Sequence, residues 1–462
     1  MQRTALIAAT LLATSAPAQV LPFAEALKPE PPPAPAPVVP AVPDLLTLDQ
    51  ALIFALENNF SIRQARERLR EQEGLIVEVR AQAIPNVSAT AGYTRDAKSL
   101  SESRDGAPAN YQNWRAAITV RQLIYSGGGV RAALDAAKTT RTAAVLDIEA
   151  VVNEVLLLVR TRFADVLLNR ERILVQEQSV ALLKEQLQTA KNRFEAGSVS
   201  QFEVLTAEVA LANAQPELIS ARNGFRVAID ELRAALGYQG GFGADLQKVP
   251  EFTGTLEYQP VAYDLEASLA AAKARRPELL RLAQIQRARE SGVTVSKADY
   301  LPEIYVTGGY QGVKRSTSNS LDDSLDGWTA GIEASWAIFD GARTRGRVAQ
   351  ARAQLNQARL SLAEQTLAIE VEVRRALSTL QEAAELAEAA GKVVGQAEEA
   401  LRLADVRYRN GAATQLDVLQ ARQALTEASL NRLEANYRHT IALASVRKAV
   451  GESDPVAASA TP

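Results

Sequence analysis

The chain has 462 residues, no cysteine, one histidine and a formal net charge of −3 at neutral pH. The lack of cysteine excludes disulfide bonds and thiolate metal sites, and a charge this close to zero excludes the strongly basic surface that binds nucleic acid. Alanine, leucine, valine, glutamate and arginine dominate, whereas aromatic residues make up only 5%. That composition is typical of long paired helices.

Residues 1–18 have the pattern of a secretory signal peptide. Arg3 supplies the positive end, 5–14 form a short apolar run, and Ala16-Pro17-Ala18 is a small-residue cleavage site. The apolar run is too short to span a bilayer as a helix. Because no cysteine follows, lipid attachment to an N-terminal cysteine is excluded.

A proline-rich segment follows at 19–44, with eight prolines between residues 29 and 43. This composition favours extended polyproline II, so we predict a linker; a ligand for another protein is the alternative. At the other end of the chain, we predict a disordered tail over 453–462.

The first predicted elements are a helix over about 47–80 and a β-hairpin over 86–124. Alternating residues begin at Val87 and again at Trp114, and the polar loop 95–113 joins the two segments. Alternating segments of about ten residues with aromatic residues near their ends are typical of outer-membrane barrel strands. A soluble hairpin packed on helices is the alternative.

A long helix is predicted next, because 67 residues without glycine or proline separate Gly129 from Gly197. Apolar residues recur there at spacings of three and four, as at Val152, Val155 and Val159, which indicates a coiled-coil seam. A helix of this length reaches roughly 100 Å, which suits a rod or a tube. A return helix over 200–236 follows the glycine that ends it.

The second half of the chain repeats the first, about 214 positions later. The matching residues include Arg193, Gly197, Gln201, Val204 and Leu205 in one copy and Arg407, Gly411, Gln415, Val418 and Leu419 in the other. We therefore predict a first repeat over 45–238, a connection over 239–263 and a second repeat over 264–452. The second repeat opens with a helix over 264–298 and has its hairpin at 303–339. A unit this long is no solenoid repeat.

Four strands per chain cannot close a membrane barrel, whose smallest examples have eight strands. Two chains would leave an interior filled by side chains, whereas three leave room for a conduit. The predicted fold class is therefore mainly α with a small β part: a long α-helical coiled-coil barrel plus a membrane β-barrel to which each chain gives four strands. A periplasmic coiled-coil scaffold without a pore is the alternative.

The doubled unit resembles the outer-membrane efflux protein family, the TolC-like export ducts. The resemblance covers about 45–452 and rests on the junctions LIYSGGG (123–129) and AIFDGAR (337–343) and on the motifs RFEAGSVSQFEVL and RYRNGAATQLDVL. It implies a homotrimeric outer-membrane channel with a periplasmic helical extension, the exit duct of a tripartite efflux or type I secretion system. The implied partners are a periplasmic adaptor protein, an inner-membrane transporter and outer-membrane lipid. The inner-membrane partner would choose the substrate.

The resemblance also implies where function lies. A periplasmic gate would be formed by Asp417, Glu203, Tyr408 and Gln420, with Tyr408 hydrogen-bonded to Glu203 on the neighbouring hairpin. Three copies of Asp417 would form a carboxylate ring whose mutual repulsion raises its pKa. Gln420 and Ala413 depart from the TolC pattern, which has an aspartate and an arginine there, so we expect a gate that is held differently. Solvated surface charge is the alternative for both carboxylates.

Two further groups of residues follow from the resemblance. The ends of the helical hairpins would dock the adaptor through Arg193, Gly197, Ser198, Arg407, Gly411 and Ala412, although the two glycines also suit plain helix caps. A membrane aromatic belt would comprise Tyr93, Trp114, Tyr310, Trp328 and Trp336.

Nothing in the sequence indicates an enzyme, a metal site or a cofactor. The chain has no cysteine and no pair of histidines, and we expect His439 to be a helix-surface or interhelical residue. The run Gly127-Gly128-Gly129 lacks the Lys-Ser/Thr that follows a phosphate-binding loop, so we interpret it as a turn from strand to helix.

Overall fold

The computed structural model describes residues 45–97, 111–238, 250–315, 320–452 and 454. The predicted signal peptide 1–18 and linker 19–44 lie outside the described residues, and so does the tail 453–462 except Asp454. That one residue forms an ion pair with Arg160 at 2.5 Å.

The two repeats contain the same series of helices. The first repeat comprises α1 (Leu48–Asn58), α2 (Phe60–Ala81), β2 (Asn86–Arg95), β3 (Gln112–Ser126), α3 (Gly129–Glu195) and α4 (Gln201–Leu236). The second comprises α5 (Leu265–Arg275), α6 (Pro277–Ala298), β5 (Glu303–Lys314), β6 (Ser324–Ser335), α7 (Arg343–Arg409) and α8 (Gln415–Val450). Equivalent helices have equal lengths of 11, 22, 67 and 36 residues.

The prediction of one helix at the start of each repeat is wrong, because each is broken into two. Asn59 has an extended backbone between α1 and α2, and its side-chain oxygen accepts hydrogen bonds from the first turn of α2. Between α5 and α6, Arg276 is extended because it precedes Pro277, and a residue before proline disfavours the helical conformation. The break at Arg276 was therefore readable from the sequence.

The long helices α3 and α7 each bury an apolar seam, as predicted for the first of them. Val159, Val166, Ile369 and Val373 are fully buried. The shorter helices cover these seams: Ala272 of α5 and Leu279 of α6 pack against α7 in one hydrophobic cluster with Ala449 of α8. Each return helix forms a hairpin with its long helix, and α3 also packs on α8, which joins the two repeats.

The four main strands form one antiparallel sheet in the order β2-β3-β5-β6. Tyr93 lies opposite Trp114 in the first hairpin, and Tyr310 lies opposite Trp328 in the second. The β3–β5 pairing joins the hairpins and places Ile118 opposite Tyr310. β6 ends at Ser335, four residues before the predicted end of that hairpin.

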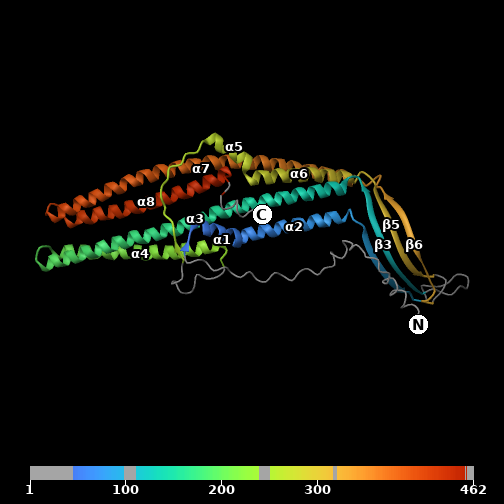
Figure 1. The fold of residues 1–462 in the computed structure, drawn as a ribbon, viewed down its shortest axis with the longest axis horizontal. Helices are drawn as coiled ribbons and strands as arrows, with labels where there is room; N and C mark the ends of the chain where they lie inside the picture. The colour runs from blue at the N-terminus through green and yellow to red at the C-terminus, as the bar shows by residue number, and fades with distance from the viewer. Residues whose placement is uncertain (1–44, 98–110, 239–249, 316–319, 453, 455–462) are drawn as a thin grey trace. The chain divides into compact units, whose positions relative to one another are not determined.

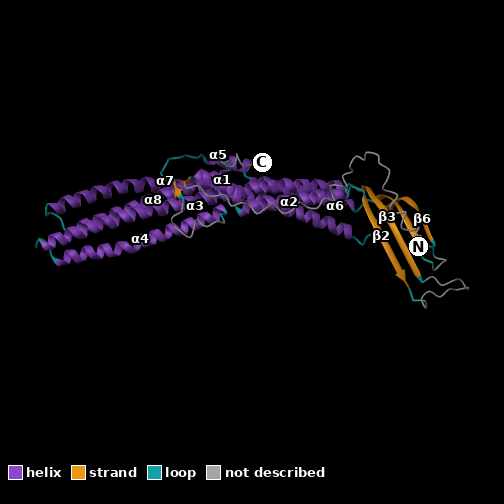
Figure 2. Ribbon diagram, turned by 60° about the horizontal axis from the view of Figure 1, so that its bottom comes forward, coloured by secondary structure: helices purple, strands orange, loops and turns teal. Residues whose placement is uncertain are grey.

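Helices and sheet occupy different ends of the described unit. The strands lie at one end, where α2, α3, α6 and α7 meet them, and the turns of the α3–α4 and α7–α8 hairpins lie together at the other (Figure 1 and Figure 2). Gly127 and Gly128 form the turn between β3 and α3 with positive φ angles of 60° and 83°.

A second, two-stranded sheet was not predicted. β1 (Leu45–Leu46) pairs in parallel with β4 (Glu251–Phe252), which belongs to the connection between the repeats. Arg170 of α3 donates hydrogen bonds to the carbonyl oxygens of Phe252 and Gly254. On the α8 side, Asn436 donates to the carbonyl oxygen of Leu256 at 2.9 Å. The described part of the connection, 250–263, is thus fixed to helices of both repeats.

Candidate functional site

The turns that end the two helical hairpins have the same backbone geometry. Gly197 and Gly411 have φ angles of 70° and 71°. In each turn the residue after the glycine donates to a carbonyl oxygen of the last helical turn: Ser198 to Arg193 and Ala412 to Arg407, both at 2.8 Å. Glycine takes this left-handed conformation without strain. The predicted docking residues on these turns are exposed, except for the half-buried Arg193.

Arg193 and Tyr408, predicted for separate roles, lie in contact between the two hairpins. The guanidinium carbon of Arg193 lies 4.8 Å from the centre of the Tyr408 ring, within the range of a cation–π interaction. Within one chain, no hydrogen bond joins Tyr408 to Glu203 among the described residues. That pairing stays a prediction for neighbouring copies.

Asp417 forms a capping box with Thr414 at the N-terminus of α8. Its Oδ2 accepts hydrogen bonds from the backbone N–H of Thr414 at 2.7 Å and from the Thr414 hydroxyl at 2.8 Å, and the Asp417 N–H donates to that hydroxyl. These bonds hold the pKa of Asp417 below its usual value. The capping geometry therefore opposes the rise in pKa that we expected from a carboxylate ring.

Glu203 is the equivalent of Asp417 on the first hairpin, but it does not cap its helix. Ser200, at the start of α4, makes no side-chain capping bond. The Oε2 atom of Glu203 is buried and has no hydrogen-bond partner among the described residues. Gln415 is also buried there, with both amide atoms unpaired in the described part of the chain, whereas Gln420 is exposed. Gln415 matches Gln201 of the first repeat, but nothing in the sequence indicated a role for it at the gate.

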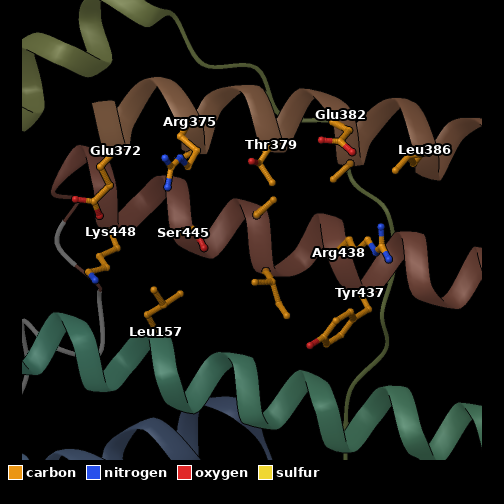
Figure 3. A pocket seen from close by; sticks show the side chains of 14 residues that line it. Leu157, Glu372, Arg375, Thr379, Glu382, Leu386, Tyr437, Arg438, Ser445 and Lys448 are labelled. Carbon is orange, nitrogen blue, oxygen red and sulfur yellow. The ribbon is translucent and has the colours of Figure 1, made fainter. Parts of the chain in front are cut away.

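A cavity of about 480 Å³ lies farther along the helices, between α7, α8 and α3. Figure 3 shows Arg375, Thr379, Glu382 and Leu386 from α7 beside Tyr437 and Lys448 from α8, with Leu157 of α3 below them. Arg375 and Glu382 form no ion pair within the described ranges. Two charged groups on the α7 side of this cavity, Arg375 and Glu382, are thus left without an ion-pair partner among the described residues.

The predicted aromatic belt occupies the apolar face of the sheet. Tyr93, Trp114, Tyr310 and Trp328 share this face by strand alternation. Trp336 follows β6 directly, eight residues beyond Trp328, and its indole N–H donates to the Tyr300 carbonyl oxygen at 3.1 Å. Eight strand residues span roughly 27 Å along the strand, which is about 20 Å of height at the tilt of a membrane-barrel strand, against an apolar band about 25 Å tall.

His439 is buried near the connection between the repeats. Its ring packs edge-on against Tyr258, with centroids 4.8 Å apart, and its Nε2 has no partner among the described residues. Burial lowers the pKa of His439, which favours the neutral ring. Nearby, Tyr437 donates to Asp165 of α3 at 2.5 Å, and burial together with this bond raises the pKa of Tyr437. His439 is therefore interhelical.

The arrangement of two long hairpins and four strands matches a known family. The model of the family described as outer membrane efflux protein matches residues 53–238 and 269–452. The chain belongs to the outer membrane efflux protein family. Its two matched segments correspond to the two structural repeats, so the predicted family and fold class are confirmed.

Individual relatives agree with this assignment over most of their length. Nodulation protein T of Rhizobium leguminosarum bv. trifolii is 23% identical over 412 residues, covering 87% of this chain and 85% of the relative. The cobalt-zinc-cadmium resistance protein CzcC of Cupriavidus metallidurans is 26% identical over 400 residues, covering 84% and 86%. The crystal structure of the Campylobacter jejuni CmeC outer membrane channel superposes with a TM-score of 0.77 at 18% identity, covering 89% and 88%.

This outer-membrane efflux protein is a channel of the outer membrane with a periplasmic helical domain, and it serves tripartite efflux or type I secretion. It is a transport protein, not an enzyme. The family implies a trimeric channel that works with efflux pumps. None of the helices in the described part of the chain has the length and apolarity needed to cross a membrane.

Proposed function

We propose that three copies of this chain assemble into a duct that receives substrates at the hairpin ends and releases them through the sheets. A periplasmic adaptor protein and an inner-membrane transporter are the partners at the hairpin ends, and outer-membrane lipid surrounds the sheets. The transporter selects the substrate. The observation that supports the proposal is that the two repeats carry equivalent contact surfaces. Among the described residues, one pair of these surfaces is in contact within the chain and the equivalent pair is exposed.

The pair of surfaces that is in contact lies between α3 and α8. Leu157 of α3 faces α8 across the cavity of Figure 3, Arg172 pairs with Glu434 at 2.8 Å, and Ser179 lines a groove with α8. The repeat equivalents of these α3 residues lie on α7, which in the described part of the chain packs on α5, α6 and α8 and makes no comparable contact with α4. They are the apolar residues Val371, Leu386 and Val393.

These α7 residues and their neighbour Leu367 are between 41% and 62% exposed. A matching apolar face exists on α4, the repeat equivalent of α8. Its members are between 48% and 66% exposed and comprise Leu205, Val209, Ile219 and Val227. Exposed apolar stripes of this kind mark contact surfaces. We infer that α7 of one copy packs on α4 of the next, as α3 packs on α8.

The sheet supports the same assembly and suggests a register for it. Inside the chain β3 pairs with β5, with Val120 opposite Gly308. The repeat equivalents are Ala334 of β6 and Ala91 of β2, which lie on the two outer strands of the sheet. Pairing β6 of one copy with β2 of the next therefore places Ala334 opposite Ala91. Three copies then close a barrel of twelve strands, wide enough for a conduit.

The remaining assignments follow from this assembly. We place the entrance gate at Asp417, Glu203, Tyr408 and Gln420, and the adaptor contact on the exposed hairpin turns that contain Gly197 and Gly411. The aromatic residues of the sheet form the membrane belt, because tyrosine and tryptophan favour the interface between lipid and water.

Disulfide cross-linking tests the assembly, since the chain has no cysteine of its own. We expect the double variant Ala91→Cys/Ala334→Cys to give covalent trimers on a non-reducing gel after oxidation in outer membranes. A link within one chain is excluded by distance, because three strand spacings of about 4.8 Å separate β2 from β6.

The matched control is Ala91→Cys/Ala330→Cys, which moves the second thiol four residues along the same face of β6. It should give no covalent trimer. Equal linking in both variants, or only monomers in the first, would exclude the proposed register. Current through planar bilayers separates a duct from a scaffold without a pore, since only the duct conducts.

The gate assignment has its own test. We expect Asp417→Asn to weaken the block of that current by divalent cations, because the variant removes a carboxylate from the entrance. The control is Glu398→Gln, which neutralises an exposed carboxylate on α7 farther from the hairpin turn. It should leave the block unchanged. Unchanged block in Asp417→Asn would remove Asp417 from the entrance.

A further inference from the structure

The two hairpins of one chain are loosely packed near their ends. A groove of about 820 Å³ lies between α3 and α4 of the first hairpin and α8 of the second. This groove is larger than the cavity of about 480 Å³ that lies between α3, α7 and α8 closer to the connection between the repeats.

Polar contacts across the seam between α3 and α8 are also unevenly distributed. Close to the connection, Glu154 pairs with Lys448, Asp165 bonds to Tyr437 and Arg172 pairs with Glu434. Beyond Arg172, only two polar contacts join the hairpins among the described residues. One is the contact of Arg193 with the Tyr408 ring, and the other is made by Arg422.

Arg422 lies on α8 and reaches across the groove to α3. Its Nη1 donates a hydrogen bond to the Leu182 carbonyl oxygen at 2.7 Å, and its Nε is buried without a partner in the described part of the chain. The guanidinium is charged at every pH that the protein meets. A hydrogen bond from a charged donor to a carbonyl oxygen is stronger than one between two neutral groups.

The repeat explains why Arg422 is free to make this bond. Its equivalent in the first hairpin is Glu208, which forms an ion pair with Lys191 at 3.1 Å inside that hairpin. In the second hairpin both charges are reversed: the equivalents are Arg422 and Asp405. Asp405 pairs with Arg409 on its own helix at 2.6 Å, and Arg422 bonds to the other hairpin instead.

We propose that Arg422 is a positioning residue of the gate, which holds α8 against α3 and keeps the entrance closed. The proposal rests on the trimeric duct described above. On the seam between copies, Glu208 takes the place of Arg422 and is paired within its own hairpin. Of these two equivalent residues, only Arg422 forms a bond between hairpins that can be released. The proposed opening is therefore at the α3–α8 seam within each chain. Arg422 lies five residues from Asp417 on the same helix, roughly 7.5 Å along its axis, so release of Arg422 moves the Asp417 end of α8.

Single-channel recording on trimers of Arg422→Ala tests this role. We expect the ratio of open to closed channels to rise about tenfold, because a hydrogen bond from a charged donor contributes on that scale. Arg422→Lys keeps a charged donor and should restore the wild-type ratio. The control is Arg402→Ala, which removes an exposed arginine paired with Glu399 on its own helix and should have no effect.

A cross-link across the groove separates a latch from a general loss of structure. Ser179 and Thr426 line the groove from α3 and α8. In the Arg422→Ala background, bridging Ser179→Cys and Thr426→Cys with a flexible bis-maleimide should return the ratio to the wild-type value. A variant that had merely lost its fold would not recover in this way.

The outcomes distinguish the latch from the duct. If Arg422→Ala forms the trimer linked through Ala91 and Ala334 but gates like Arg402→Ala, the latch is excluded and the duct stands. If the Ala91→Cys/Ala334→Cys variant, which retains Arg422, gives no linked trimer and no current, the proposed function fails and the latch fails with it.

Discussion

The two repeats make an equivalent contact with different side chains. In each repeat a short helix breaks before the next helix, and the break is fixed to the last turn of the return helix. In the first repeat Asn59 donates to the Ala235 carbonyl oxygen at 2.6 Å. In the second, Arg276 donates to the carbonyl oxygens of Lys448 and Ala449 and forms ion pairs with Glu278 and Glu372.

The difference shows that the fold requires the contact but not a particular side chain. Asn59 and Arg276 are both buried. A neutral amide needs only hydrogen-bond partners, whereas a buried guanidinium also needs carboxylates to balance its charge. The second repeat therefore depends on more residues at this point, and it should be the more sensitive of the two to mutation.

The largest expected effect is that of Arg276→Ala, which should lower the free energy of unfolding by about 3 kcal/mol or more, because it removes the shared partner of Glu278, Glu372 and the Ala449 carbonyl oxygen. Asn59→Ala should cost about 1–2 kcal/mol through the lost helix cap and buried hydrogen bond. Urea unfolding followed by circular dichroism, at one protein concentration in detergent, measures both. A larger loss in Asn59→Ala than in Arg276→Ala would contradict the comparison.

The glycines that follow the two return helices give a second comparison between the repeats. Gly237 and Gly451 both have left-handed φ angles, so alanine should cost about 1 kcal/mol at either position. A Cβ at Gly237 would also lie 2.5 Å from the Asn58 carbonyl oxygen, whereas at Gly451 its nearest contact is the Arg275 Cβ at 3.3 Å. Thermal unfolding should therefore show a greater loss for Gly237→Ala. Equal losses would mean that the backbone near Asn58 moves aside.

The helix caps at the hairpin ends differ in the same way. Thr414→Ala should lower the free energy of local opening in the first turn of α8 by about 1 kcal/mol, because Thr414 caps that turn. Ser200→Ala should change little in α4, where Ser200 makes no side-chain cap. Hydrogen exchange of the two first turns gives both values. Similar changes in the two turns would show that Ser200 does cap α4.

The smallest effect concerns His439, whose equivalent in the first repeat is Phe225. Because burial lowers the folded-state pKa of His439, the unfolded chain binds the proton more readily. Its contribution to stability is present above the unfolded pKa of about 6.5 and is lost as pH falls below it. His439→Phe should reduce the loss of stability between about pH 6.5 and 5. An unchanged pH profile in unfolding experiments would assign that loss to other groups.

Much of the architecture was predictable because its signals are periodic and repeated. The absence of helix breakers predicted the long helices, and strand alternation predicted which residues share the face with Tyr93 and Trp328. Asn59 carried no comparable signal, since an asparagine inside an apolar pattern becomes a break only when Ala235 is there to accept its hydrogen bond. The parallel pairing of β1 with β4 was missed because two residues per strand are too few to show a period.

The candidate site was only partly predictable. The turns at Gly197 and Gly411 follow from local backbone preferences, so their geometry could be inferred from sequence. The Ser200–Glu203 spacing carries a capping-box pattern, yet the box forms between Thr414 and Asp417 instead. Arg422 carried no signal, because an arginine on a helix is ordinary until its partner on another helix is known.

The sequence by itself determined the doubled plan, the lengths of the long helices and the faces of the strands, because these depend on neighbours along the chain. Only the tertiary structure decided which of two equivalent residues makes a contact: Arg422 rather than Glu208 at the seam, and Arg276 rather than Asn59 as the centre of an ion-pair network. The physical reason is that a polar side chain takes the partner that lies within hydrogen-bond distance in space. Two copies of one unit meet different neighbours once they fold together.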